Sequence, residues 1–429
     1  MIATALPFPT ATLPHIATWG VAAIATAGVI LRPWRVPEAA WALLGALVLV
    51  ATGLLSPGDA GRAIAKGLDV YLFLAGMMVL AELARQEGVF DHLAALAVRL
   101  SRGSAHRLFA LVYAVGTVVT VLMSNDATAV VLTPAVYAAA KKAGVKPLPY
   151  LFACALIANA ASFVLPISNP ANLVIFGDRL PPLLQWLGQF LAPSILAIAG
   201  TYGVLRLLYR SELSAPVDSA IEVLPLSSGG RLALAGILGV AVALLAASAA
   251  GWPLGWPTLI ASAIAASAVL ASKRESPLGL LRPVAWGVLL LVAGLFVLVE
   301  GVAATGLADS LTRLLHVASA ASAPATAWSA GFAIALVSNL VNNLPAGLVA
   351  GAVVAAADVP EFTRSAIAIG IDLGPNLSVT GSLATILWLI AIRREGENVT
   401  AFEFLRVGLV VMPLTLLLAL GALMLQHAL

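Results

Sequence analysis

The chain has 429 residues, of which 61% are hydrophobic and only 10% are charged, and its net charge is +3. Soluble domains carry about 25% charged residues, so this composition excludes an ordinary soluble protein and indicates a polytopic membrane protein. The basic residues lie in short loops between apolar runs. Membrane topology therefore accounts for the positive charge, and we expect no nucleic-acid partner.

Apolar runs in chain order predict ten membrane-spanning segments, two of which are broken. The eight continuous helices are predicted at residues 18–31, 39–55, 68–83, 183–208, 232–248, 258–272, 284–300 and 404–425. Segments 89–100 and 306–315 place apolar residues at helical spacing between charges, which predicts amphipathic helices at the membrane interface. The predicted fold class is therefore an all-α membrane protein.

A polar stretch, Ser124-Asn125-Asp126, interrupts the apolar sequence between Arg107 and Lys141. Two complete spans need about 40 residues, and only 33 lie between these two basic flanks. An Asn-Asp pair in a lipid-facing helix would also be costly. We therefore expect a re-entrant helical hairpin at 108–140, with its polar tip buried in protein or facing a water-filled cavity.

The same pattern, a polar pair between two apolar runs, occurs again about 217 residues later. It predicts a second hairpin at 325–357 with Asn342-Asn343 at its tip. Two further apolar runs, 150–176 and 363–392, are interrupted by proline, glycine and asparagine. Each is predicted to be a broken helix, whose unwound backbone and second-half N-terminus face a binding cavity.

Glu82 and Gly88 match Glu300 and Gly306 at a constant offset of 218 residues, and the hairpins and broken helices follow in the same order. This match predicts an internal repeat. We divide the chain into N-terminal helices (1–67), a first repeat (68–209), a linker loop with two helices (210–282) and a second repeat (283–429).

The distribution of basic residues predicts the orientation of the chain. If both termini lie outside the inner (plasma) membrane, 18 of the 23 Lys and Arg residues are cytoplasmic and 5 are external. Hairpin 108–140 then enters from the cytoplasm and hairpin 325–357 from outside, so the repeats are inverted. Inverted repeats with broken helices are typical of secondary transporters that bind substrate near the membrane midplane.

Asp126 and Asp372 are the acids that lie deepest in apolar sequence. Because desolvation favours the neutral carboxyl group, both are candidates for carrying a coupling proton. Asp126 could instead cap the second arm of its hairpin, and Asp372 could be a hydrogen-bonded packing residue. Glu82 and Glu300 fit structural ion pairs better.

Amides and hydroxyls at the tips and breaks form the other candidate set, although some could simply tie helix breaks together. Because no Arg or Lys stands among them, such a site suits a small neutral polyol-like solute or a cation and suits a dicarboxylate poorly. The predicted substrate-binding residues are Ser124, Asn125, Asp126, Ser168, Asn169, Asn172, Ser338, Asn339, Asn342, Asn343, Asn376, Thr380, Gly381 and Ser382.

The single cysteine, Cys154, excludes a disulfide within the chain and a Cys-rich metal site. No two of the five histidines have helical ligand spacing, so we expect no metal and no cofactor. The first apolar run has no basic segment before it and no clear cleavage site, and we expect no signal peptide.

Three stretches resemble the arsenite/antimonite efflux permeases (the ArsB type) of the ion transporter superfamily. They are SNDATAVVLTP at 124–134, SNLVNNLP at 338–345 and GPNLSVTGSLATILW at 374–388, and PISNPAN at 166–172 is similar to the family's first helix break. Thr128 and Val379 depart from the pattern, where a smaller residue and a proline are expected. The resemblance, which spans about residues 68–388, implies export of As(OH)3 and Sb(OH)3 in exchange for protons. It also implies, in some systems, a cytosolic ATPase subunit as partner.

A trihydroxy solute fits the polar residues, since As(III) usually binds several thiolates and one cysteine cannot supply them. The alternatives are a sodium/proton antiporter or a carboxylate transporter of the same superfamily, and a gated channel. A membrane enzyme is disfavoured because the chain has no HExxH motif, catalytic triad or cofactor loop. The expected partners are the metalloid, protons and membrane lipids, and the loop from Arg210 to Arg231 is the candidate docking surface for an ATPase subunit.

Overall fold

The computed structural model describes residues 12–428, and within this range every regular element is helical. Among residues 12–428, eight helices are long and apolar enough to cross a membrane, or nine if the bent pair α3 (Pro57–Lys66) and α4 (Leu68–Gln86) forms one span. The all-α membrane architecture predicted from composition is confirmed. The two predicted broken helices, each made of two short half-helices, fall outside this count because neither half spans a membrane alone.

The first half of the chain follows the predicted order, with one added short helix, α3, before the third span. Its remaining helices are α1 (Leu13–Leu31), α2 (Glu38–Ala51), α5 (Val89–Leu100), α6 (Ala105–Leu122), α7 (Asn125–Ala127), α8 (Thr133–Lys142), α9 (Leu148–Ala160), α10 (Pro170–Phe176) and α11 (Leu183–Leu208). A π-helix at Thr128–Leu132 joins α7 to α8.

The second half repeats this order, with the single helix α18 in the place of α7, the π-helix and α8. Its helices are α12 (Ser228–Ala249), α13 (Gly255–Lys273), α14 (Pro277–Leu281), α15 (Gly287–Ala304), α16 (Leu307–Ala321), α17 (Ala323–Val341), α18 (Asn343–Ala356), α19 (Glu361–Leu373), α20 (Leu383–Arg394) and α21 (Ala401–Ala428). Since α12, α13 and α14 match α1, α2 and α3 in kind and order, we infer that the N-terminal helices belong to the repeat as well.

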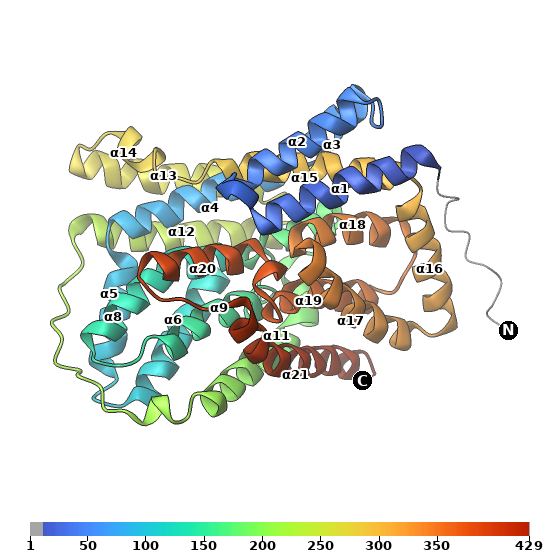
Figure 1. Cartoon of the computed structure of the whole chain (residues 1–429). Coiled ribbons are helices and arrows are strands. Elements are labelled where there is room, and N and C mark those ends of the chain that lie inside the picture. The colour runs from blue at the N-terminus through green and yellow to red at the C-terminus, as the bar shows by residue number, and fades with distance from the viewer. Residues whose placement is uncertain (1–11, 429) are drawn as a thin grey trace.

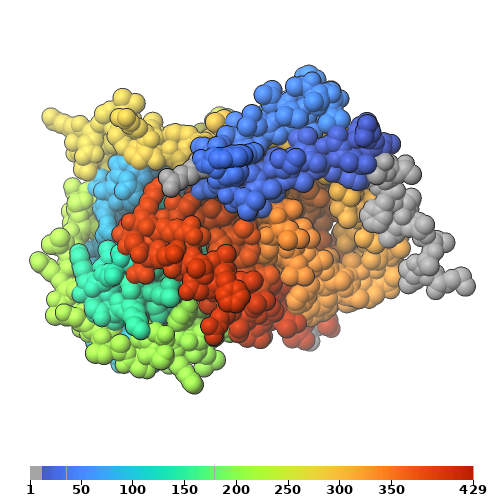
Figure 2. Space-filling model, in the orientation of Figure 1, coloured from blue at the N-terminus to red at the C-terminus, as the bar shows by residue number. Residues whose placement is uncertain are grey.

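The two hairpins enter the molecule from opposite ends. Helices α5 and α8 lie at one end and α16 lies at the other (Figure 1). Each amphipathic helix packs against both arms of its own hairpin, α5 on α6 and α8, and α16 on α17 and α18. In the space-filling view the C-terminal segment, in red, lies between the teal first hairpin and the orange second hairpin (Figure 2). The hairpin tips therefore approach a common centre.

The halves exchange helices outside this centre. Helix α2 packs on α15, and α13 packs on α4. The close approaches use matching glycines: a Cβ at Gly294 would lie 2.8 Å from the Ala42 backbone, and a Cβ at Gly76 would lie 2.9 Å from the Leu259 nitrogen. Only a residue without a side chain admits a backbone this near. The crossed packing ties each repeat to the other.

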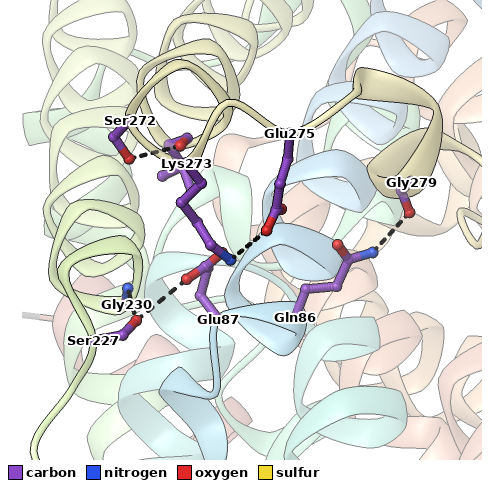
Figure 3. A network of polar contacts seen from close by, with 9 residues as sticks. Gln86, Glu87, Ser227, Gly230, Ser272, Lys273, Glu275 and Gly279 are labelled. Atoms are coloured by element: carbon purple, nitrogen blue, oxygen red, sulfur yellow. Dashed lines mark hydrogen bonds and ion pairs between the residues drawn. The ribbon is translucent and has the colours of Figure 1, made fainter.

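A polar clasp, formed by Glu87, Ser227 and Lys273, joins the end of α4 to α12 and α13 (Figure 3). Lys273 Nζ lies 2.8 Å from Glu87 Oε1, and the Glu87 side chain is only 4% exposed. The Ser227 hydroxyl donates to Glu87 Oε2 over 3.4 Å and also caps α12. The clasp fixes the register of the exchanged helices at the end where α5 and α14 lie.

Candidate functional site

The centre of the molecule is built from the two helix breaks, as the sequence predicted. Helix α9 ends at Ala160 and its continuation α10 begins at Pro170, while α19 ends at Leu373 and α20 begins at Leu383. Pro166 and Pro375 lie within the breaks, where proline removes an N–H donor and stops regular helix. Each second half-helix then starts from a buried polar N-cap, Asn169 for α10 and Ser382 for α20.

Asp372 lies fully buried in the last turn of α19 and binds across to the first repeat. Its Oδ1 accepts a hydrogen bond of 2.6 Å from Asn169 Nδ2, and Asn169 Oδ1 accepts from the Ala171 N–H to cap α10. Oδ2 is also buried and has no hydrogen-bond partner among the described residues, and the Ser162 hydroxyl donates to the Asn159 carbonyl. One carboxylate oxygen is thus held, while the other keeps its capacity for a further hydrogen bond or a proton.

A second cross-repeat network involves Asn159, which was not among the predicted site residues. Asn159 Nδ2 donates to Asn376 Oδ1 over 3.0 Å, and Asn376 Nδ2 donates to the Leu156 carbonyl over 3.1 Å. Ser382 Oγ donates to Asn159 Oδ1 over 3.4 Å while capping α20. One feature could have pointed to Asn159: it is the last residue but one of α9, just as Asp372 is the last residue but one of α19.

The first hairpin turns at Ser124, whose hydroxyl accepts from the Ala127 N–H as a helix cap. Asn125 Oδ1 accepts from the Asp126 backbone N–H, so this amide also shapes the tip. The arm then continues as a π-helix before Pro134, where proline cannot complete an α-helical hydrogen bond. Thr133 Oγ1 donates to the Thr128 carbonyl, at the first residue of this π-helix.

The second tip is tied to the second break. Asn342 has a φ of 73° and a ψ of 151°, a backbone conformation outside the left-handed helical region that residues other than glycine rarely adopt. Its Nδ2 donates to the Thr380 carbonyl over 3.2 Å. Asn339 Oδ1 accepts from Ser378, and its Nδ2 donates to the Gly374 carbonyl over 2.9 Å. These amides hold the tip against the unwound segment.

A cavity of about 740 Å³ opens beside the first tip. Ser124, Asp126 and Pro170 line it, together with Leu383 at the start of α20. Besides Asp126, the charged residues that line it are Glu82, Arg85, Asp91, Arg394 and Glu395, and Arg85 is paired with Glu82 at 2.6 Å. The cavity thus runs from charged helix ends to the polar tip and the N-termini of both second half-helices.

The predicted site residues therefore divide into four groups. Ser124 and Asp126 line the cavity, and Asn169 meets Asp372 behind it. Besides the tip amides Asn125, Asn339 and Asn342, the others bond to backbone or to Asn159: Ser168 to the Val121 carbonyl, Asn172 to the Ser162 carbonyl, Ser338 to the Ala335 carbonyl, Thr380 to the Asn339 carbonyl, and Asn376 and Ser382 to the Asn159 side chain. Gly381 and Asn343 are buried beside them.

A second cavity, of about 840 Å³, lies between the second hairpin and α1, α15 and α16. Its lining is almost wholly aliphatic, with Thr26, Thr326 and Ser329 among its few polar residues. Across residues 12–428 no group of three or more His, Cys, Asp and Glu side chains has an arrangement that could hold a metal ion. Because the second cavity is almost wholly aliphatic, the polar cavity beside Asp126 is the better candidate for the substrate path.

Comparison with known proteins places this architecture among transporters. Residues 22–392 match the family model described as citrate transporter. An arsenical pump membrane protein of Yersinia enterocolitica is 28% identical over 82% of this chain and 84% of its own. The arsenical pump membrane protein of Escherichia coli K12 is 27% identical over 90% and 92%, respectively. These relatives confirm the resemblance drawn from the sequence motifs.

An uncharacterized transporter of Mycobacterium tuberculosis is 25% identical over 91% of this chain and 94% of its own. Among solved structures, the YdaH transporter of Alcanivorax borkumensis is similar with a TM-score of 0.52 and 17% identity, over 87% of this chain and 89% of that one. This structural similarity supports the all-α membrane fold described above.

Proposed function

Because the chain belongs to the citrate transporter family, we propose that this membrane transporter exports trivalent metalloids, arsenite and antimonite as neutral trihydroxides, in exchange for protons. Relatives named as arsenical pump membrane proteins, matched over 84% and 92% of their length, support the substrate class. The chemistry of the cavity supports it as well, since hydroxyl, amide and carboxyl groups at the tip suit a small neutral polyol-like solute.

The orientation that fits this function has both termini outside and the cavity open to the cytoplasm. The cavity lies on the side of the first hairpin, whose flanks carry Arg102, Arg107, Lys141, Lys142 and Lys146, and basic loops favour the cytoplasmic side. A cytoplasmic trihydroxide would then reach Ser124 and Asp126 at the tip. Outward release follows when the inverted repeats exchange their conformations.

The contact between Asp372 and Asn169, which crosses between the repeats, is the observation that supports the proposed proton exchange. Asp372 is fully buried, with one oxygen held by an amide donor and the other without a hydrogen bond to any residue that the structure describes. A proton can bind that second oxygen without breaking the contact. Because burial disfavours the ionised carboxylate, proton binding and release there can be linked to the conformation of the break. Asp126, which lines the cavity, is the second candidate carrier.

The test is arsenite uptake into everted membrane vesicles, whose lumen corresponds to the cell exterior. An inside-acidic pH gradient should drive arsenite inward, and a protonophore should abolish the stimulation. The double variant Asp126→Asn/Asp372→Asn should lose the response to the gradient. If that variant responded as the wild type does, the coupling scheme would be wrong.

Citrate is the matched alternative substrate, because the family model carries that description and Arg394 lines the cavity. Uptake of citrate in the same vesicles, with no arsenite movement, would assign the protein to carboxylate transport. Proton release on addition of sodium, again without arsenite movement, would assign it to sodium/proton exchange.

A further inference from the structure

The two crossed contacts at the centre occupy equivalent places in the two repeats. Asn159 and Asp372 are each the last residue but one of the first half-helix. Asn169 and Ser382 are each the N-cap of the second half-helix. Asp372 binds the cap of the first repeat at 2.6 Å, and Asn159 binds the cap of the second repeat at 3.4 Å. Each pair therefore joins one repeat to the other in the same manner.

The surroundings of the two positions also match. Asn159 and Asp372 are both completely buried, and their caps are buried to within 2%. Beside each pair, the break donates a hydroxyl hydrogen bond to the final turn of its own hairpin arm: Ser168 to the Val121 carbonyl and Thr380 to the Asn339 carbonyl. The pairs differ mainly in chemistry, since one contains a carboxyl group and the other contains a carboxamide.

Among the described residues, no second carboxylate faces Asp372 from the helices packed against it. Helices α10, α17 and α18 carry no ionisable side chain, and α19 itself carries only Glu361 and Arg364 near its far end. On α11 and α21 the charged or titratable groups Arg206, Glu403, Arg406 and His427 are exposed near helix ends. The remaining groups are Tyr202 on α11 and Tyr150 and Cys154 on α9. Of the two equivalent positions at the centre, only residue 372 therefore carries an acid.

We propose that Asn159 is the neutral counterpart of Asp372 and that a carboxyl group at residue 159, paired with the cap at residue 382, can couple transport to protons in its place. The proposal rests on the proposed proton exchange. Its reason is geometric: inverted repeats reach opposite access states by exchanging conformations, so an acid at either equivalent position experiences the same alternation.

The test moves the acid from one repeat to the other. Asp372→Asn should lower gradient-driven arsenite uptake by about tenfold or more, within the range of free-energy coupling between linked sites. The same variant should keep arsenite counterflow, which needs alternating access but no proton. The exchange variant Asn159→Asp/Asp372→Asn should recover gradient-driven uptake to within about threefold of wild type, because coupling is restored when one titrating site is restored.

The exchange also removes a hydrogen bond, because the Asn159→Asp change deletes the amide that donates to Asn376 Oδ1. A second variant therefore exchanges the caps too, adding Asn169→Ser and Ser382→Asn so that an amide donor again faces the acid. Infrared spectroscopy supplies a measurement independent of transport. The band of the buried carboxyl group should disappear in Asp372→Asn and return in both exchange variants.

The outcomes separate the two proposals. Wild-type uptake that ignores the pH gradient would contradict the proposed proton exchange. A coupled wild type, an uncoupled Asp372→Asn and two exchange variants with counterflow but no recovery would overturn the equivalence of the positions. Failure of both exchange variants to fold, judged by thermal unfolding in detergent, would overturn it as well, since equivalent positions must accept the acid equally.

Discussion

The residues of the central site are defined by pairing rather than by polarity alone. Asp372 and Asn169 were predicted separately, but only the structure shows that they bind each other across the repeats. Asn159 was missed because a single asparagine in an apolar run resembles a packing residue. Its partner Asn376 lies more than 200 positions later in the chain. Buried amides must be satisfied, but the sequence does not name the partner.

Gly381 is the residue whose replacement tests how closely the second break must pack. A Cβ at this position would lie 2.5 Å from the Pro375 Cα and 2.7 Å from Asn339 Oδ1. Because the nearest atom is backbone, Gly381→Ala should lower the free energy of unfolding by about 1–3 kcal/mol through overpacking. We also expect reduced arsenite transport, since Asn339 holds the second break through Ser378 and Gly374.

The matched control for this change is Gly239→Ala on α12, where an added Cβ would meet no atom within 4 Å apart from its chain neighbours and the nearby backbone of its own helix. Alanine favours a helix over glycine by about 1 kcal/mol, so this variant should be as stable as wild type or more so. Thermal unfolding in detergent measures both. Equal stability of the two variants would contradict the tight crossing at Gly381.

At the scale of elements, local signals gave helix positions with small errors. The predicted helix at 183–208 is observed as α11 with the same limits, and the amphipathic segment 89–100 is observed as α5. Helix α3 was not predicted because it is short and carries Asp59, Arg62 and Lys66. Helix α16 extends to Ala321, past the predicted end at 315, because Ser322 begins the next helix as its cap.

The polar clasp at the end of α4 provides the prediction at this scale. Lys273→Gln should lower the free energy of unfolding by about 1–3 kcal/mol, because a nearly buried carboxylate loses its charged hydrogen-bond partner. Glu87 is the buried member, with a side chain only 4% exposed. Thermal and denaturant unfolding in detergent measure the change.

Lys66→Gln is the control for the clasp. Lys66 also joins two elements through an ion pair, 2.9 Å from Glu300, but the two side chains are 60% and 32% exposed. Exposed pairs contribute about 0–1 kcal/mol, so this variant should stay close to wild type. A larger loss in Lys66→Gln than in Lys273→Gln would show that burial does not decide the strength of the clasp.

For the whole molecule, the internal repeat is the organising feature. In the structure it includes more helices than the matched sequence motifs covered. Helices α2 and α13 each pack on the long helix of the other half, α15 and α4. The centre shows the same exchange in the contacts of Asn169 and Ser382. Because both the helix packing and the central hydrogen bonds cross between the repeats, neither half forms the site alone.

The orientation of this molecule can be measured with cysteine labelling. Cys154 is completely buried, and it should not react with a membrane-impermeant maleimide. In a Cys154→Ala background, Ser211→Cys in the loop after α11 should react in everted vesicles and not in intact cells. Ala320→Cys at the end of α16 should show the reverse, because both positions are exposed and lie on opposite sides under the proposed topology.

Labelling of both cysteines from the same side would contradict inverted repeats in a membrane. Exchange of the two patterns would instead reverse the proposed orientation and place the cavity beside Asp126 on the outside. The Cys154→Ala protein without an added cysteine is the matched control for nonspecific labelling.

The sequence by itself determined the membrane class, the positions of the hairpins and broken helices, and the internal repeat. These follow from hydropathy, from proline and glycine positions, and from spacing, all of which act locally along the chain. Only the tertiary structure decided which polar groups meet, which of them line the cavity, and which helices the halves exchange. Those outcomes depend on contacts between residues far apart in the chain, such as Asn169 with Asp372 and Asn159 with Asn376, and no local pattern specifies such a partner.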